Sequence, residues 1–440
     1  MNIAQAKEEI KHTVKAYLMK DEAGEYKIPA IRQRPVLLMG PPGIGKTQIM
    51  EQIATECGIG LVSYTITHHT RQSAVGLPMI HEEEFQGKKY SVTEYTMSEI
   101  IATVYRRIRD FDEKEGILFI DEINCVSETL TPAMLQFLQC KTFGNEKVPE
   151  GWIIVAAGNP PEYNKSVRDF DMVTLDRIRY INIEADLNVW KIYAKEQHIH
   201  SAILSYLELR PKNFYRVEAD VDGLQFVTAR GWEDLSSLMK VYEEAELPVT
   251  REIVHEFIRN EDIAEDAAAY FDLYQKYRDD YGIPEILDGK VDSDIYARLL
   301  NASFDEKISV INLLLDGLTQ NFIRYYKEKK LTDEWYQSLK ARKSELSEDE
   351  FESEREKFKP QTKKLSEVRE KTKSRIEHAF DFCEDAAFSD QELLIFITGL
   401  TLGKESAVFL SENLCERYLS YNEKFMTGSR RTELLSELER

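Results

Sequence analysis

The residues with the clearest chemical potential form one glycine-rich segment that fits the pattern GxxxxGK[ST]. Its members are Gly40, Pro41, Pro42, Gly43, Ile44, Gly45, Lys46 and Thr47. In this pattern the glycines let successive backbone N–H groups point at phosphate oxygens. Lys46 would add a positive charge for the β- and γ-phosphates, and the Thr47 hydroxyl would ligate Mg²⁺. The segment therefore predicts a site for nucleotide phosphates, with a chance glycine-rich turn as the alternative.

Two adjacent acids, Asp121 and Glu122, form a second chemical group directly after the apolar run 117–120. A carboxylate at the end of a buried parallel strand lies where nucleotide-bound Mg²⁺ needs a ligand. We expect Asp121 to serve the metal through its waters and Glu122 to polarise the attacking water as general base. Ordinary solvated acids at a strand end are the alternative.

A third polar residue, Asn159, follows the apolar run 152–157. An asparagine at the end of a strand beside a nucleotide would orient the lytic water or bind the γ-phosphate. Ligands of open parallel sheets gather at the carboxyl ends of the strands, and all three groups are predicted at such ends. They are therefore expected to meet at one edge of one sheet.

The elements that must position these residues are short strands and amphipathic helices. The apolar run 35–39 predicts a buried strand before the glycine-rich segment, and 47–54 predicts a helix after it. Residues 131–139 predict a second helix with Thr131 as N-cap and Pro132 in its first turn. A short hairpin is expected over 141–149, because glycine and asparagine stand at its centre.

The order of the motifs GPPGIGKT, ILFIDEIN, VAAGNP, LDRIR and TARGWEDL resembles that of AAA+ ATPases, and within them the MoxR group. The resemblance covers roughly residues 1–260. It implies an ATPase with ATP and Mg²⁺ as cofactors, working as a homo-oligomeric ring, expected to be a hexamer. It also implies a chaperone-like role in activating a protein client, of the kind that often carries a von Willebrand A domain.

The resemblance assigns roles to two arginines. Arg177 matches the arginine finger, which neutralises the γ-phosphate held by a neighbouring subunit. Arg168 and Arg179 are the alternative finger candidates. Arg230 matches the lid arginine that senses the γ-phosphate, and a surface salt bridge is the alternative for each. In the resembled family a hairpin before the Asn159 strand, here 141–149, faces the central pore. A second family insertion, in the helix after the second strand, would fall near residues 73–78, and a plain surface loop is the alternative for both.

Three regions are expected along the chain. Residues 1–185 form the AAA+ α/β domain, 186–280 a helical lid, and 281–440 a charged helical region. In the last region, capping boxes at 347–350 and 389–392 predict helix starts. Apolar residues seven apart predict a protruding helical pair there: Leu339 with Leu346, and Phe351, Phe358 and Leu365.

Composition narrows the classes of function. The chain has 440 residues, with 78 acids against 57 bases, and its net charge of −21 makes nucleic acid an unexpected partner. The longest apolar run, 393–402, is far shorter than the ~20 residues of a membrane span. Five cysteines without a CxxC pair suit a reducing compartment, so we expect a cytoplasmic location.

Two other functions remain open at this point. One is a nucleotide-gated scaffold that binds ATP with little turnover, and the other is a nucleic-acid motor. The presence of Glu122 and Asn159 favours the enzyme over the scaffold, and the acidity of the chain disfavours the motor.

Overall fold

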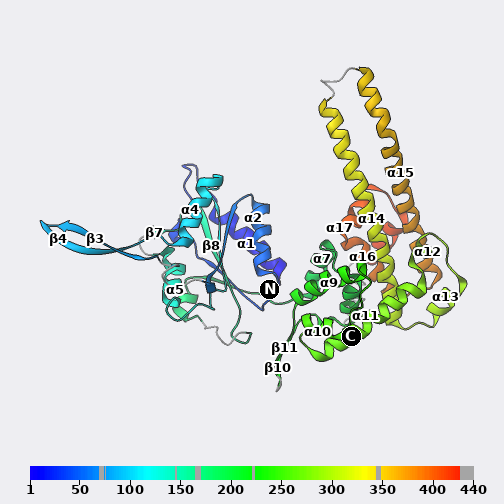
Figure 1. Cartoon of the computed structure of the whole chain (residues 1–440), viewed down its shortest axis with the longest axis horizontal. Coiled ribbons are helices and arrows are strands. Elements are labelled where there is room, and N and C mark those ends of the chain that lie inside the picture. Colours follow the sequence, from blue (N-terminus) through cyan, green and yellow to red (C-terminus); the bar gives the residue numbers. More distant parts are fainter. Residues whose placement is uncertain are drawn as a thin grey trace. The chain divides into compact units, whose positions relative to one another are not determined.

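The computed structural model describes residues 1–68, 74, 76–143, 146–163, 170–220, 223–342 and 348–426. The chain divides into two compact units, each of which is described by itself (Figure 1). The first comprises Met1–Val189 with Thr228–Arg230, and the second comprises Trp190–Val227 with Gly231–Arg440.

A five-stranded parallel sheet forms the centre of the first unit, in the order β2-β5-β8-β1-β9. The strands are β1 (Val36–Met39), β2 (Gly60–Thr65), β5 (Gly116–Asp121), β8 (Trp152–Gly158) and β9 (Arg179–Asn182). The three apolar runs predicted from the sequence are β1, β5 and β8, which lie side by side in the middle of the sheet and are almost wholly buried. The predicted α/β fold with a parallel sheet and a helical C-terminal region is confirmed.

Helices cover both faces of this sheet, because successive strand side chains point to opposite faces. In β1, Val36 and Leu38 belong to the apolar cluster formed with α1 and α2, whereas Leu37 and Met39 belong to the cluster formed with α4 and α5. The helices of this unit are α1 (Ile3–Tyr17), α2 (Lys46–Cys57), α4 (Glu99–Phe111), α5 (Thr131–Cys140) and α6 (Met172–Leu175), with short 3-10 turns at Ala30–Arg32 and Ile66–His68. The sheet is therefore fixed between two layers, and its carboxyl edge is free to carry polar groups.

The start of α5 differs from the prediction by one residue. Leu130 is the N-cap, and Thr131 is the first helical residue. The Thr131 hydroxyl donates to the carbonyl oxygen of Ser127 at 3.0 Å, as does the Thr131 backbone N–H, so the chain already turns before the helix begins. The predicted N-cap role of Thr131 is therefore wrong, while Pro132 does lie in the first turn.

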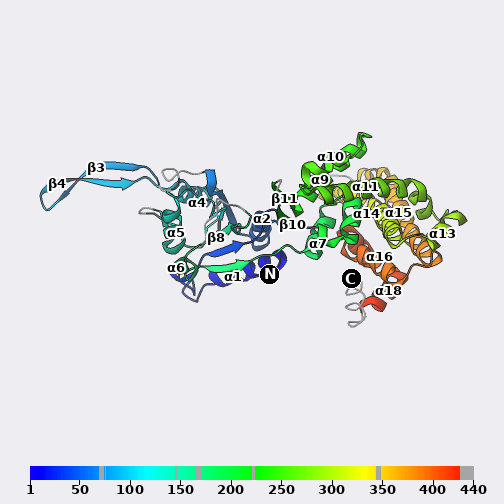
Figure 2. The same ribbon diagram turned by 90° about the horizontal axis from the view of Figure 1, so that it is seen from below.

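A long antiparallel hairpin, which the sequence did not lead us to expect, lies between β2 and α4. Its strands are β3 (Pro78–Phe85) and β4 (Lys88–Tyr95), and it extends well beyond the sheet (Figures 1 and 2). Gln86 and Gly87 form the turn, both with positive φ. The insertion predicted near residues 73–78 ends where β3 begins, and residues 73 and 75 lie outside the described residues.

The shorter hairpin predicted over 141–149 is present as an antiparallel pair, β6 (Thr142–Phe143) and β7 (Glu146–Lys147). Its central residues, 144 and 145, lie outside the described part of the chain.

The second unit is mainly helical. Its helices, two of which begin in the first unit, are α7 (Leu187–Glu196), α8 (Ser201–Leu209), α9 (Ala229–Glu244), α10 (Arg251–Phe257), α11 (Glu261–Tyr281), α12 (Ile283–Leu287), α13 (Ser293–Leu300), α14 (Phe304–Ala341), α15 (Glu348–Asp385), α16 (Asp390–Leu402), α17 (Lys404–Glu412) and α18 (Glu416–Met426), with a 3-10 turn at Pro211–Asn213. Strands β10 (Arg216–Asp220) and β11 (Gly223–Val227) form an antiparallel pair. The prediction of a helical lid over residues 186–280 did not include this hairpin.

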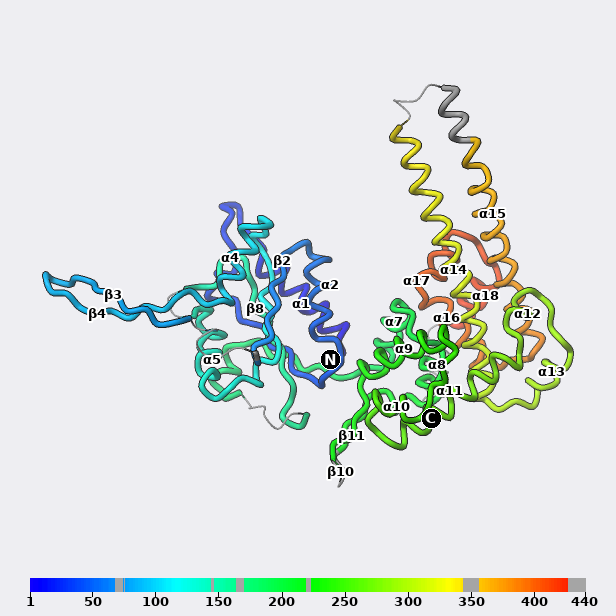
Figure 3. Tube along the Cα trace, viewed as in Figure 1, coloured from blue at the N-terminus to red at the C-terminus, as the bar shows by residue number. Residues whose placement is uncertain are grey.

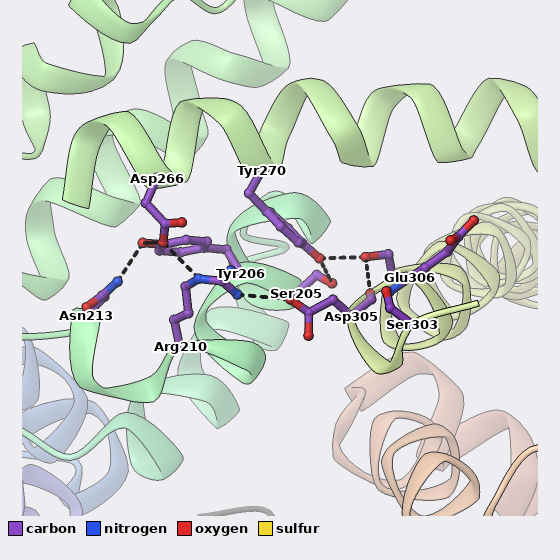
Figure 4. Close-up of polar contacts among 10 residues, drawn as sticks. Ser205, Tyr206, Arg210, Asn213, Asp266, Tyr270, Ser303, Asp305 and Glu306 are labelled. Carbon is purple, nitrogen blue, oxygen red and sulfur yellow. Dashed lines mark hydrogen bonds and ion pairs between the residues drawn. The ribbon is translucent and has the colours of Figure 1, made fainter. Parts of the chain in front are cut away.

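A polar network joins α8, α11 and α14 (Figure 4). The Tyr270 hydroxyl lies 2.7 Å from the Ser205 hydroxyl and 2.8 Å from the Ser309 hydroxyl. Nearby, the Arg210 guanidinium pairs with Asp266 at 2.8 Å. Because α8 and α11 belong to the predicted lid and α14 to the region after it, these bonds tie the two regions together.

Removing one hydroxyl from this network should destabilise the second unit. Tyr270 is buried, so Tyr270→Phe leaves the serine hydroxyls that face it with one partner fewer. We expect the free energy of unfolding to fall by about 1–2 kcal/mol, measured by urea denaturation. Tyr336→Phe, at a tyrosine that is 56% exposed, is the matched control and should change little. Equal stability of the two variants would contradict a stabilising network.

The predicted helical pair is formed by α14 and α15, which run side by side (Figure 3). Between them, the rings of Trp335 and Phe358 stack at 3.9 Å, and the Lys364 ammonium pairs with Glu328 at 2.7 Å. Leu339 is buried as expected.

The capping box at Ser389 and Glu392 is confirmed at the start of α16. The one predicted at 347–350 begins outside the described residues, as does Leu346, and the side chain of Phe351 is likewise not described.

In the described part of the chain, no single helix is both long and apolar enough to cross a bilayer. Among the helices that the structure describes, α16 and α17 reach that length and apolarity when they are counted together, and they are bent by 86° at their break.

Candidate nucleotide site

The glycine-rich loop connects β1 to α2 and leaves the first turn of that helix open. Gly43 and Gly45 have φ values of 72° and 90°, which glycine adopts without the strain that a side chain would bring. Gly45 is the N-cap of α2, so no side chain caps the helix, and the first turn carries no acid. The partly buried Ile44 side chain packs on the apolar core and anchors the loop. Uncapped N–H groups at the positive end of a helix dipole form a ready site for an anion.

Lys46 lies at the base of this loop, with only 8% of its surface exposed. Its ammonium donates to the carbonyl oxygens of Gly40 and Pro41 and to the side-chain oxygen of Asn159, each at 2.8 Å. Burial lowers the pKa of Lys46 to about 8, and the charge of Arg230 acts in the same direction. A phosphate group beside Lys46 would favour the charged form, so the buried lysine suits an anionic ligand.

Thr47 and Asp121 come together at the ends of α2 and β5. The Thr47 hydroxyl donates to one carboxylate oxygen of Asp121 at 2.7 Å, and the backbone N–H of Glu122 donates to the other at 2.9 Å. A hydroxyl and a carboxylate are hard oxygen donors of the kind that Mg²⁺ prefers. The two side chains therefore fit the metal-binding roles predicted for them.

Glu122 has a backbone conformation that is uncommon for a residue with a side chain. Its φ is +57°, in the left-handed region, and its carboxylate accepts a hydrogen bond from the Thr67 hydroxyl at 2.9 Å. Such strain clusters at functional sites, where the surrounding structure holds it in place. Thr67 follows β2 in a turn, and no sequence pattern pointed to its contact with the predicted base.

Asn159 follows β8 and lies within hydrogen-bond distance of Lys46, as described above. Its backbone is held by Asn124, a residue 5% exposed that was not predicted to belong to the site. Asn124 lies three positions after Asp121, inside the quoted motif ILFIDEIN, and that nearness was the available signal.

Arg230 stands in the first turn of α9, and residues 228–230 belong to the first unit. A side chain added at Gly43 would place its Cβ 3.3 Å from the Thr228 side chain and 3.4 Å from the Cβ of Arg230. Arg230 is therefore beside the phosphate loop, as the predicted γ-phosphate contact requires.

The three candidate finger arginines lie in different surroundings. Arg177 is exposed and donates to the side chain of Gln139 on α5. Arg179 donates to the Thr13 hydroxyl at 2.6 Å and pairs with Glu9, both on α1, so it supports the sheet edge. Arg168 lies outside the described residues. Of the two that the structure describes, Arg177 is the more exposed, and Arg179 is the one bonded to α1.

Residues 36–174 match the family model of the ATPase family associated with various cellular activities, AAA. The match runs from the first residue of β1 into α6, so it includes the phosphate loop, Asp121, Glu122 and Asn159. The chain therefore contains an AAA ATPase domain, which supports nucleotide binding by the site described above. Arg177 and Arg230 lie beyond the matched residues.

Proposed function

We propose that the chain is an Mg²⁺-dependent ATPase of the MoxR type, which works as a hexameric ring and uses ATP hydrolysis to remodel or activate a client protein. The observation that supports it most directly is the meeting of Lys46, Asp121, Glu122 and Asn159 at the carboxyl edge of one parallel sheet. The proposal places the chain in the cytoplasm, where ATP is supplied.

The proposed reaction converts ATP and water to ADP and phosphate. Lys46 and the α2 N-terminus bind the phosphates, and Thr47 and Asp121 would hold Mg²⁺, which neutralises phosphate charge when bound. Glu122 accepts a proton from the attacking water as the bond to the γ-phosphorus forms and the bond to the β–γ bridging oxygen breaks. Asn159 orients this water. Phosphate release from the wild-type chain at saturating ATP and Mg²⁺ tests the proposal directly.

The proposed ring makes Arg177 act on the nucleotide of a neighbouring subunit. Arg177→Ala should therefore bind ATP normally and fail to hydrolyse it. Mixed with Glu122→Gln, it should recover part of the activity, because about a quarter of the interfaces in a randomly mixed ring pair an intact Glu122 with an intact Arg177. Phosphate release from co-assembled mixtures is the measurement.

Arg179→Ala is the comparison variant, because its ties to α1 predict lower thermal stability without a defect that mixing repairs. Two inactive variants that stay inactive in proven mixed rings would count against a trans-acting Arg177. Arg168→Ala, carried through the same mixing experiment, would then identify the finger.

Two alternative functions, a nucleotide-gated scaffold and a nucleic-acid motor, predict different rates of phosphate release. A scaffold would bind ATP and release almost no phosphate, whereas a nucleic-acid motor would turn over faster with DNA. The net charge of −21 disfavours the motor.

The client is best sought by capture on the Glu122→Gln variant, which should hold ATP and keep the client bound. Proteins with a von Willebrand A domain are the expected class.

A further inference from the structure

We propose that Asn124 is a positioning residue, which acts through Asn159 on the ATP hydrolysis proposed above and to that extent rests on the proposed function. Asn124 is 5% exposed and lies in the loop after β5, between the ends of three strands. No family motif discussed above gives it a role.

The side chain of Asn124 holds both polar groups of the Asn159 backbone. Its Nδ2 donates to the Asn159 carbonyl oxygen at 2.8 Å, and its Oδ1 accepts from the Asn159 N–H at 3.3 Å. The same Nδ2 lies 3.9 Å from the sulfur of Met39, at the end of β1. Because the N–H needs an acceptor and the carbonyl a donor, this pair of bonds fixes which way the Asn124 amide points.

The end of β8 is shaped to receive this amide. A Cβ at Gly158 would lie 2.5 Å from Oδ1 of Asn124 and 2.9 Å from its Cγ, so a residue with a side chain at position 158 would displace it. The backbone of the loop is held at the same place, because the N–H of Ile123 donates to the carbonyl oxygen of Ala157 at 2.9 Å. The lack of a side chain at Gly158 therefore leaves the space that the Asn124 amide occupies.

This arrangement connects the predicted catalytic groups. Asn159 has its backbone fixed by Asn124, and its side-chain oxygen accepts from Lys46. Asn124 itself lies two residues after Glu122 in the same loop. The side chain that would orient the water is therefore bonded to the phosphate-binding lysine, and its backbone is bonded to the loop that carries the base.

The two hydrogen bonds to the Asn159 backbone require an amide side chain as short as that of asparagine. Leucine has a similar shape but neither donor nor acceptor, so both backbone groups of Asn159 would lose their partner. Aspartate keeps an acceptor for the N–H and places a second oxygen against the Asn159 carbonyl, where a donor is needed. Asn124→Leu and Asn124→Asp therefore damage the positioning in two different ways.

The first measurement needs no turnover. Hydrogen exchange of the Asn159 amide should become at least ~10-fold faster in Asn124→Leu, because its acceptor is gone. In Asn124→Asp, the Asn159 amide should keep most of its protection against hydrogen exchange, because the aspartate still offers an acceptor. Asn260→Leu is the matched control, since Asn260 is 4% exposed and also bonds a backbone N–H, that of Ile263 on α11. In Asn260→Leu, the Asn159 amide should exchange at the same rate as in the wild type.

The second measurement is of turnover and affinity. Both Asn124 variants should lower kcat by about 10–100-fold, as loss of a supporting residue does, with the dissociation constant for ATP within about threefold of wild type. Adding Asn124→Leu to Asn159→Ala should lower kcat no further, because Asn124 acts only through Asn159. A purely structural role would instead lower stability with kcat retained, as expected for Asn260→Leu.

Three results would overturn the proposal: normal kcat in both Asn124 variants, effects that multiply with Asn159→Ala, or unchanged exchange of the Asn159 amide in Asn124→Leu. A wild-type chain that releases no phosphate would instead overturn the proposed function and the catalytic consequence for Asn124. The exchange measurement would still decide whether Asn124 fixes Asn159.

Discussion

Lys46→Ala should abolish measurable ATP binding. The Lys46 ammonium is buried at the base of the phosphate loop and has three oxygen partners within 2.8 Å. Without it, the phosphates lose their main side-chain counter-charge. A loss of at least ~100-fold in affinity is expected, since hydrogen bonds to charged groups contribute about 1.5–3 kcal/mol each and 1.4 kcal/mol is tenfold. Isothermal titration calorimetry with ATP and Mg²⁺ measures the change.

Two further variants separate lost charge from lost packing. Lys46→Met keeps the apolar stem and should bind as poorly as Lys46→Ala. Lys141→Met is the matched control, because burial also lowers the pKa of Lys141 to about 8, and its ammonium donates to the carbonyl oxygen of Ala30 at 2.6 Å, away from the loop. Near-normal ATP affinity in Lys46→Met would show that the charge is not what holds the phosphates.

Glu122→Gln should bind ATP with near-normal affinity and hydrolyse it at least ~100-fold more slowly, the usual effect of losing a general base. Glutamine keeps the size of the side chain and an oxygen that can accept from the Thr67 hydroxyl. It cannot accept the proton of the attacking water. Single-turnover phosphate release after premixing with ATP measures the chemical step apart from binding.

Glu113→Gln is the control for this experiment. Glu113 precedes β5 at the amino end of the strand, whereas Glu122 follows its carboxyl end, and it pairs with Arg107 at 2.6 Å. Losing a partly exposed ion pair costs about 0–1 kcal/mol and should leave turnover unchanged. Turnover near the wild-type rate in Glu122→Gln would mean that another group is the base.

Local sequence patterns determined much of the first unit. The runs around 36–39, 117–120 and 152–157 are apolar enough to specify buried strands, and strand ends are where polar residues can reach a ligand. The phosphate loop could be recognised because its chemistry depends on one short contiguous segment. These features arise within about ten residues of chain, so the sequence alone carries them.

The surroundings of these residues depended on the tertiary structure. Asn124 and Thr67 looked like ordinary loop residues, because their partners, Asn159 and Glu122, lie 35 and 55 positions away. Strand order in the sheet decides which loops meet, and no local pattern encodes that order. The hairpin β3–β4 was missed for a different reason: its turn is Gln86-Gly87 and not one of the usual Asn-Gly or Asp-Gly pairs.

The candidate finger arginines also show what the sequence determined and what the tertiary structure added. The sequence by itself placed Arg177 and Arg179 two positions apart, with equal charge and reach. The family resemblance favoured Arg177, and the tertiary structure added different surroundings for the two, because β9 packs against β1 and brings Arg179 onto Glu9 and Thr13 of α1, while Arg177 is exposed. Residue type and spacing thus determined which chemistry the chain carries, and long-range packing decided which side chains surround each of these groups.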